Sequence, residues 1–222
     1  TNTLSAGQKT LYRAQIGSEG GEVSMKQLTF KVSVSTTSNM TLANFRLQKN
    51  SSNMNSSDVS ITDAYGVNLQ TTTMDVHTSP ATTTVMVLVR FTGEETVSGS
   101  GNTYALNATV GGLNSTTGDS ITTSLANRTF SGAVSSNVIT GYLAQGSAQI
   151  TVESEDAGRV GIATTAAPSV TIGTGDVAYG MLWSDMSEGP HTSNINGIDS
   201  GVYSRDWTNE YLVDTISGSQ VM

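Results

Sequence analysis

Apolar and polar residues alternate along several short stretches of this chain, and a period of two is the signature of β-strands. Between Gln27 and Val34 every second residue is apolar, and Thr, Lys and Ser stand between them. The same alternation occurs in residues 10–16, 43–47 and 103–110. Because no stretch shows a convincing helical period, the pattern predicts a chain built mainly from strands.

One run differs from the others because it is apolar at nearly every position. Residues 85–91 read VMVLVRF, which is continuously apolar up to Arg90. A strand that is covered on both faces has such a run, so this segment is predicted to lie at the centre of a sheet. Weaker strand candidates lie at 58–62, 119–125, 148–153, 160–164 and 177–183.

Turn-forming residues separate the strand candidates. The turn signals are GSEGG at 17–21, TGEE at 92–95, SGSGN at 98–102 and GGLNSTTGD at 111–119. Strands spaced in this way predict an all-β fold, an Ig-like or jelly-roll β-sandwich. We expect this sandwich to span residues 1–183, and an irregular C-terminal tail, residues 184–222, to pack on its own or a neighbouring subunit.

The composition agrees with strands joined by polar turns. The 222 residues include 33 Thr, 30 Ser and 23 Gly, and only 13% of them are charged. Disordered chains usually combine high charge with abundant Pro, whereas this chain has 3 Pro and β-branched apolar runs. Its length is sufficient for a core of ordinary size.

Charge and cysteine content exclude several classes of protein and partner. The chain has no Cys, which excludes a disulfide framework, thiolate metal sites and cysteine nucleophiles. Its net charge of −8 argues against nucleic acid as a partner. Residues 1–91 carry a net +2 and residues 92–222 carry −10, a division that suits head-to-tail contact between copies.

The sequence also bears on where the protein is found. No apolar run reaches the roughly 18 residues that a membrane-spanning helix needs. The chain begins at Thr1 rather than Met, and we expect that a leader peptide has been removed. A secreted protein, extracellular or at the cell surface, is the predicted class.

The stretch LWSDMSEGPH, residues 182–191, combines the residue types of a hydrolase site. Ser184, Asp185 and His191 are a nucleophile, an acid and a base by type. However, no G-x-S-x-G elbow surrounds Ser184, and members of a triad usually come from distant parts of a chain. We therefore interpret the stretch as a polar turn after a strand and expect no enzyme.

Metal binding is the second interpretation of the same stretch. Zinc requires three or four His, Cys or carboxylate ligands, and the two histidines, His77 and His191, are far apart. Calcium requires only oxygen ligands, for which the candidates are Asp185, Glu188 and Asp199, or the acidic patch at 153–156. No other cofactor is expected.

Other catalytic and nucleotide-binding patterns give no support. Glu94–Glu95 and Glu153–Glu155 are close in the sequence, but a glycosidase needs two carboxylates across a cleft lined by aromatic residues, and aromatic content is 6%. The glycine-rich stretches lack the pattern of a phosphate-binding loop. Both features are interpreted as solvated turns.

Six N-x-[ST] sequons make glycosylation a further prediction. The one at Asn107 lies on the strand face expected to point outward, whereas two others belong to a polar loop at 50–58. The acceptors are Asn39, Asn50, Asn55, Asn107, Asn114 and Asn127.

Two segments resemble a group of uncharacterised secreted bacterial β-sandwich surface proteins. Residues 6–34, AGQKTLYRAQIGSEGGEVSMKQLTFKVSV, resemble the opening of such repeats. WSD at 183–185, His191 and DWTNEYLV at 206–213 are similar to their closing segment. The resemblance covers about 70 residues at the two ends. It implies a surface-layer-like or filament-subunit-like structural protein rather than an enzyme.

Self-assembly is the mechanism that this class suggests, because a sandwich has open edges that an extended strand from a neighbour can complete. The N-terminal segment, residues 1–17, is the first donor candidate, and residues 211–222 are the second; equally, both ends could pair within their own sandwich. The two tryptophans would fix the tail to the sandwich or to a neighbour. The predicted assembly residues are Tyr12, Ala14, Ile16, Trp183, Trp207, Tyr211, Leu212 and Val213.

Two functions therefore remain open from the sequence. The first is a structural subunit of an extracellular filament or surface layer, pilus-like or S-layer-like, whose partners are copies of itself. The alternative is a monomeric adhesin or carbohydrate-binding module that recognises cell-surface glycans.

Overall fold

The computed structural model describes residues 4–36, 38–63, 67–76, 82–113, 118–125, 150–152, 160–162, 181–185, 207–209 and 218–222. This part of the chain is all-β and has no helix. The strands are β1 Gly7–Ile16, β2 Val23–Ser35, β3 Thr41–Lys49, β4 Ser52–Asn53, β5 Val59–Asp63, β6 Met74–Asp75, β7 Thr82–Val97, β8 Asn102–Gly111, β9 Ser120–Leu125, β10 Ile150–Val152, β11 Val160–Ile162, β12 Leu182–Ser184, β13 Trp207–Asn209 and β14 Gln220–Val221.

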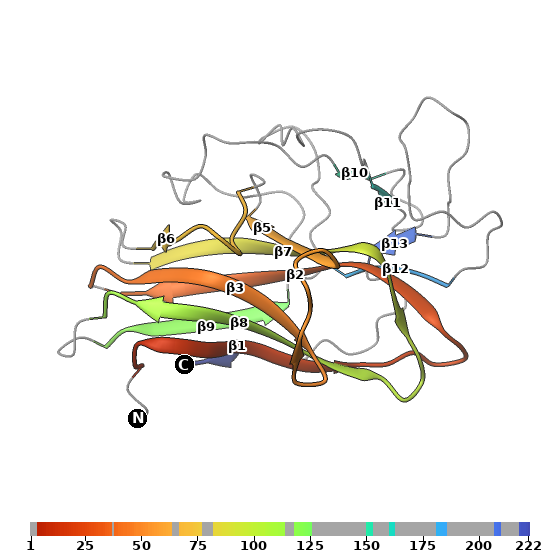
Figure 1. Cartoon of the computed structure of the whole chain (residues 1–222), viewed down its shortest axis with the longest axis horizontal. Coiled ribbons are helices and arrows are strands. Elements are labelled where there is room, and N and C mark those ends of the chain that lie inside the picture. The colour runs from red at the N-terminus through yellow and green to blue at the C-terminus, as the bar shows by residue number, and fades with distance from the viewer. Residues whose placement is uncertain are drawn as a thin grey trace.

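Two antiparallel sheets form a β-sandwich, and their strands run along the long axis of the molecule (Figure 1). The five-stranded sheet has the order β1-β8-β3-β4, and β6 also pairs with β3. The seven-stranded sheet has the order β13-β12-β2-β7-β5, and β9 pairs with both β2 and β14. The predicted all-β sandwich is confirmed, while its Ig-like or jelly-roll type stays a prediction. β10 and β11 form a separate two-stranded ladder.

The pair β2–β7 is the backbone of the seven-stranded sheet, and its alternation decides which side chains enter the core. Leu28 pairs with Val89, and Phe30 with Val87, so their side chains share the inner face. Met86 and Leu88 of β7 alternate with these residues and are buried too, outside the main core cluster. Burial on both faces confirms that the VMVLVRF run forms a central strand.

Aromatic pairs join the two sheets across the core. The rings of Tyr12 in β1 and Phe30 in β2 pack edge to face with centroids 5.7 Å apart. Those of Phe91 in β7 and Tyr104 in β8 do the same at 6.4 Å. Because each pair takes one ring from each sheet, these contacts fix the distance between the layers as well as burying apolar area.

Bulges interrupt the simple alternation at two places in the five-stranded sheet. The β1–β8 register shifts between Thr10 and Tyr12, so the extra residue, Leu11, is buried next to Tyr12 instead of facing outward as the alternation predicts. In β3 the shift lies between Ala43 and Arg46, and Asn44 there has a φ of 51°. A bulge bends the strand and turns a side chain to the other face, which a strict period of two cannot predict.

The TGEE stretch, expected as a turn, lies inside β7. Met25 of β2 pairs with Glu95, and Gln27 pairs with Arg90, so residues 91–94 of β7 lie opposite Lys26 alone. The buried Lys26 Nζ donates to the carbonyls of Thr92 and Gly93, both at 2.9 Å. This ammonium group satisfies the carbonyls that the bulge leaves out of the ladder, and the strand continues past it.

The region expected as an irregular tail contributes strands to the seven-stranded sheet. The expected boundary at residue 183 falls inside β12, which pairs with β2 on one side and β13 on the other. β14 pairs with β9. β2 extends beyond β9 at its N-terminal half, and β12 binds the backbone groups that would otherwise be unpaired there.

Within the described ranges, no helix has the length and apolar character to cross a membrane.

Candidate assembly site

One side of the sandwich is closed by the short segment 218–222, which we call the closing segment. Its strand β14 pairs with the edge of β9, where Val221 lies opposite Thr122. Met222 and Ile121 exchange two backbone hydrogen bonds, Met222 N–H to Ile121 O at 2.9 Å and Ile121 N–H to Met222 O at 3.0 Å. In Figure 1 this strand, in dark blue beside the C mark, lies next to β1.

A glutamine side chain links the closing segment to the other sheet. The main-chain N–H of Arg13 in β1 donates to Gln220 Oε1 at 3.0 Å, and Gln220 Nε2 donates to the Arg13 carbonyl at 2.7 Å. The amide group thus bonds one residue of an edge strand as a neighbouring strand would. The closing segment therefore joins β9 of one sheet to β1 of the other.

The closing segment is held by few apolar contacts. Val221 is 67% exposed and is the one large apolar side chain that is exposed among the described residues. Met222 is only partly buried against the core. Most of the attachment therefore comes from the backbone bonds to β9 and the two bonds of Gln220.

The opposite side of the sandwich is closed far more firmly, by residues 67–76. Leu69, Met74 and Val76 are fully buried in the core, and each buried side chain of this kind contributes roughly 1.5–3 kcal/mol. The Leu69 N–H donates to Ile61 O in β5, and Leu69 O accepts from Phe45 N–H in β3, so this segment also joins the two sheets.

Gln70 repeats at this side what Gln220 does at the other. The Ile61 N–H of edge strand β5 donates to Gln70 Oε1, and Gln70 Nε2 donates to the Val59 carbonyl, both at 3.3 Å. Each open side thus has a glutamine amide bonded to the backbone of an edge strand. The two sides differ in the burial of the segment that carries the glutamine.

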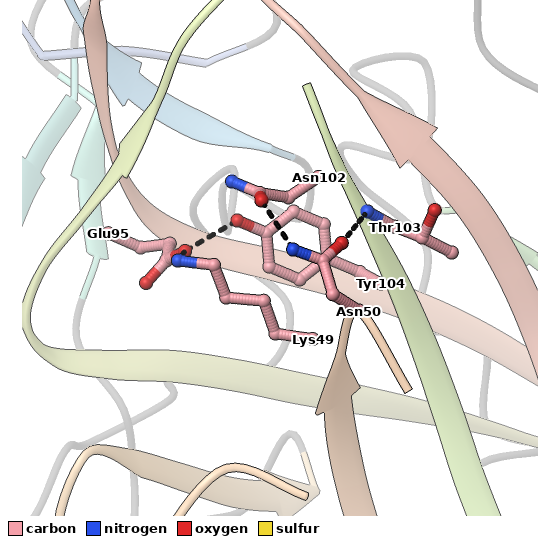
Figure 2. A network of polar contacts seen from close by, with 6 residues as sticks. All are labelled: Lys49, Asn50, Glu95, Asn102, Thr103 and Tyr104. Carbon is pink, nitrogen blue, oxygen red and sulfur yellow. Dashed lines mark hydrogen bonds and ion pairs between the residues drawn. The ribbon is translucent and has the colours of Figure 1, made fainter. Parts of the chain in front are cut away.

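A polar cluster joins the sheets at the end of the sandwich where β3 and β7 end and β8 begins (Figure 2). Tyr104 Oη of β8 donates to Glu95 Oε1 of β7 at 2.6 Å, and the Lys49 ammonium of β3 forms an ion pair with the same oxygen. Lys49 and Tyr104 belong to one sheet and Glu95 to the other. Burial, followed by the hydrogen bond to Glu95, raises the pKa of the Tyr104 phenol far above its usual value.

The hairpin beside this cluster is held by an asparagine ladder. Asn50 and Ser51 have φ values of 50° and 71°, as in a two-residue type I′ turn between β3 and β4. Asn50 Nδ2 donates to Asn102 Oδ1 at 2.8 Å, and Asn50 Oδ1 accepts from the Thr103 N–H at 2.9 Å. Polar contacts therefore link β3, β7 and β8 at this end of the sandwich.

The serine of the LWSDMSEGPH stretch lies on a buried strand. Ser184 is buried in β12 opposite Ser24 of β2, whose hydroxyl donates to Glu94 Oε2 at 2.8 Å. Asp185 is exposed, and His191 lies outside the described residues. The interpretation of Ser184 as a turn residue is wrong, because it ends a strand that completes the edge of β2.

The first predicted assembly residues belong to the chain's own fold. Tyr12, Ala14 and Ile16 lie in β1, which pairs with β8 along nine register positions. Tyr12 is fully buried in the core. In this structure β1 is thus an integral strand of its own sandwich, which was the other option for the N-terminal segment.

The C-terminal assembly residues are only partly described. Trp183 is partly buried and lies in β12 opposite Met25, and Trp207 lies in β13 opposite Ser184. Residues Tyr211, Leu212 and Val213 lie outside the described residues. The structure therefore places both tryptophans on strands at the same edge of the seven-stranded sheet.

The calcium candidates are not brought together in the described part of the chain. Asp185 is exposed at the end of β12, whereas Glu188, Asp199 and the patch at 153–156 lie outside the described residues. In the ranges that the structure describes, no group of three His, Asp or Glu side chains could hold a metal ion.

The sequons divide into exposed and buried acceptors. Asn39, Asn50 and Asn55 are exposed, and Asn114 and Asn127 lie outside the described residues. Asn107 lies on the face opposite the core residues Leu106 and Ala108, as expected, but its side chain is only 3% exposed, and its Oδ1 accepts from Thr10 Oγ1 at 2.6 Å. Its partner Thr10 stands opposite it in the neighbouring strand β1.

Gln220 and Gln70 are the residues that sequence reasoning missed. A glutamine that bonds an edge strand has no local motif, because its partner is 207 residues away in one case and 9 in the other. Comparison of the chain with protein-family models, with curated proteins and with solved structures gives no match. The candidate site is therefore interpreted from its own geometry.

Proposed function

We propose that this protein is a structural subunit that assembles with copies of itself into an extracellular filament or surface layer. The observation that carries the proposal is the side of the sandwich at β1, β9 and β14. There a ten-residue edge strand, β1, is met at Arg13 by a single glutamine side chain, and in the described part of the chain no strand pairs with its outer edge.

Edge strands are templates for pairing with another chain, and proteins that stay monomeric usually block them. At the β5 edge the block is present, because residues 67–70 run along that strand. The contrast between the two edges supports a contact between copies at β1. The secreted location and the structural rather than enzymatic role belong to the same proposal.

The test is the state of the purified full chain at neutral pH. Negative-stain electron microscopy and light scattering coupled to size exclusion are expected to show regular filaments or sheets in equilibrium with monomer. A stable monomer over the whole concentration range would contradict the proposal and favour the adhesin or carbohydrate-binding module.

A further inference from the structure

We propose that the closing segment is exchanged between copies, so that residues 218–222 of one molecule occupy the seam between β9 and β1 of the next. This inference rests on the proposed function and names the partner of its site: a second copy of this chain. Each copy carries one such segment and one such seam, so exchange can continue from molecule to molecule.

The first support is that both halves of the contact are already seen together. β9 provides the backbone groups of Ile121 and the pairing position of Thr122, and β1 provides the N–H and C=O of Arg13. The same segment from a neighbour would form the same bonds, so exchange changes the connection between segment and sandwich but not the contacts.

The second support is the shallow attachment of the segment. Val221 is 67% exposed and Met222 only partly buried, whereas Leu69, Met74 and Val76 anchor the closure of the other side. Elements with few buried apolar contacts open before the rest of a domain does. The seam at β9 and β1 is therefore the one that can be vacated while the core stays folded.

Burial also argues against β1 as the segment that is exchanged most easily. Leu11 and Tyr12 of β1 are 1% exposed, and Tyr12 packs on Phe30. Withdrawal of β1 would remove Leu11 and Tyr12 from the core and break the whole β1–β8 ladder. The ranking expected from the sequence, N-terminal segment before C-terminal segment, is thereby reversed in the proposal.

The pairing register provides a clean chemical test. Because Ile121 and Met222 exchange two backbone bonds, the adjacent pair Val221–Thr122 is of the non-hydrogen-bonded kind, whose Cα atoms are about 4.5 Å apart. That separation is within the range of a disulfide. The protein has no Cys, so introduced cysteines have no competing partner.

The experiment mixes two full-length variants, Thr122→Cys and Val221→Cys, that carry tags of different mass. Under assembly conditions with mild oxidant, we expect a disulfide-linked heterodimer on non-reducing gels and a 122–221 linked peptide by mass spectrometry. The double variant Thr122→Cys/Val221→Cys, oxidised as a dilute monomer, should lose assembly and regain it when reduced.

The matched control replaces Thr122→Cys by Ser60→Cys on the exposed face of β5, which should yield at least tenfold less heterodimer.

Polymers on the microscope grid without a 122–221 link, or an oxidised double variant that still polymerises, would overturn the exchange and leave the proposed function intact. A 122–221 link confined to closed dimers would support the exchange and contradict the filament. The absence of both the link and polymers would overturn both.

Discussion

At the scale of single residues, the cluster of Lys49, Glu95 and Tyr104 shows how a few polar groups can join two apolar layers. The carboxylate of Glu95 comes from one sheet and both of its partners from the other. A buried hydroxyl that donates to a charged acceptor contributes about 1.5–3 kcal/mol. The cluster therefore stabilises the end of the sandwich beyond the contribution of the rings around it.

The first prediction concerns this hydroxyl. Tyr104→Phe should lower the free energy of unfolding by about 1.5–3 kcal/mol at pH 7, because Glu95 loses a donor. Since the Tyr104 pKa is raised in the folded protein, its contribution is complete below about pH 10, the usual tyrosine value, and falls as the pH rises above it. Urea unfolding at pH 7, 9 and 11 measures both effects.

Comparison of the two proteins at each pH provides the control, because Lys49 and Glu95 are present in both. The difference in stability between wild type and Tyr104→Phe should shrink between pH 9 and pH 11. A constant difference over that range would contradict the raised pKa of Tyr104.

The second prediction concerns a glycine after β8. Gly112 has a φ of 67°, and a Cβ atom there would lie 1.8 Å from the carbonyl oxygen of Asn39. Gly112→Ala should therefore cost more than about 2 kcal/mol of stability in thermal or chemical unfolding. Gly118→Ala is the matched control, because its Cβ would meet no atom within 4 Å, and it should change stability by less than about 0.5 kcal/mol. Equal effects of the two substitutions would refute the argument.

At the scale of elements, the sequence predicts existing strands well and interruptions within strands poorly. The run 85–91 and the alternation at 27–34 correspond to the central pair β7 and β2, because burial of a strand face directly imposes the pattern. The bulge at Leu11 in β1 and the bulge of β7 opposite Lys26 are not predicted by this pattern. A bulge depends on the register between two strands, and the carbonyls of the β7 bulge are bonded by Lys26, which is distant in the sequence. Neither feature is visible in the local residue pattern.

The third prediction concerns the bulge of β7. Lys26→Met removes the donor to the carbonyls of Thr92 and Gly93 while keeping most of the apolar stem, and it should destabilise the protein by about 1–3 kcal/mol. Urea unfolding measures the loss. Lys9→Met is the control, because the Lys9 ammonium donates to the exposed Ser5 hydroxyl and not to a bulge, and a comparable loss there would argue against the bulge as the cause.

The fourth prediction concerns the edge of β1. The N–H of Arg13 faces the outer edge, and so does that of Gln15 two residues on, because the ladder alternates. Gln15→Pro should therefore leave the fold intact and reduce the rate of assembly at least tenfold, as measured by light scattering.

Gln15→Thr is the control that separates loss of the backbone N–H from loss of the side chain. Both variants lose the bond from Gln15 Nε2 to Ser100 O, but only Gln15→Thr keeps the backbone N–H. It should assemble at the wild-type rate. If both variants assembled normally, edge pairing at this position would be wrong. A fall in thermal stability for Gln15→Pro alone would point to its fold instead.

At the scale of the whole molecule, the outline of the fold followed from the sequence, but the candidate site did not. The all-β sandwich reflects patterns within single strands, whereas the site depends on contacts such as Gln220 with Arg13, 207 positions apart. Of the residues chosen from the sequence as a reactive cluster, Ser184 is buried and Asp185 is exposed, whereas Glu188 and His191 lie outside the described residues.

The fifth prediction concerns charge. Each copy carries −8, and we expect the repulsion between these net charges to outweigh the attraction between the +2 and −10 portions. Raising the ionic strength from 0.01 to 0.15 M shortens the screening length from about 30 to 8 Å, and assembly at pH 7 should become faster. Light scattering over a salt series measures it. Slower assembly with salt would show that head-to-tail attraction dominates.

The firmly closed side of the sandwich limits the geometry of any polymer. Residues 67–70 occupy the β5 edge, and Leu69, Met74 and Val76 fill the core beside it, so that edge is not available to a second copy. In the proposed exchange each molecule gives its closing segment and receives another at the seam of β9 and β1, so growth would have a direction and a single dimension. Polar threads with distinguishable ends are therefore the expected product, and a two-dimensional lattice would need a second, independent contact.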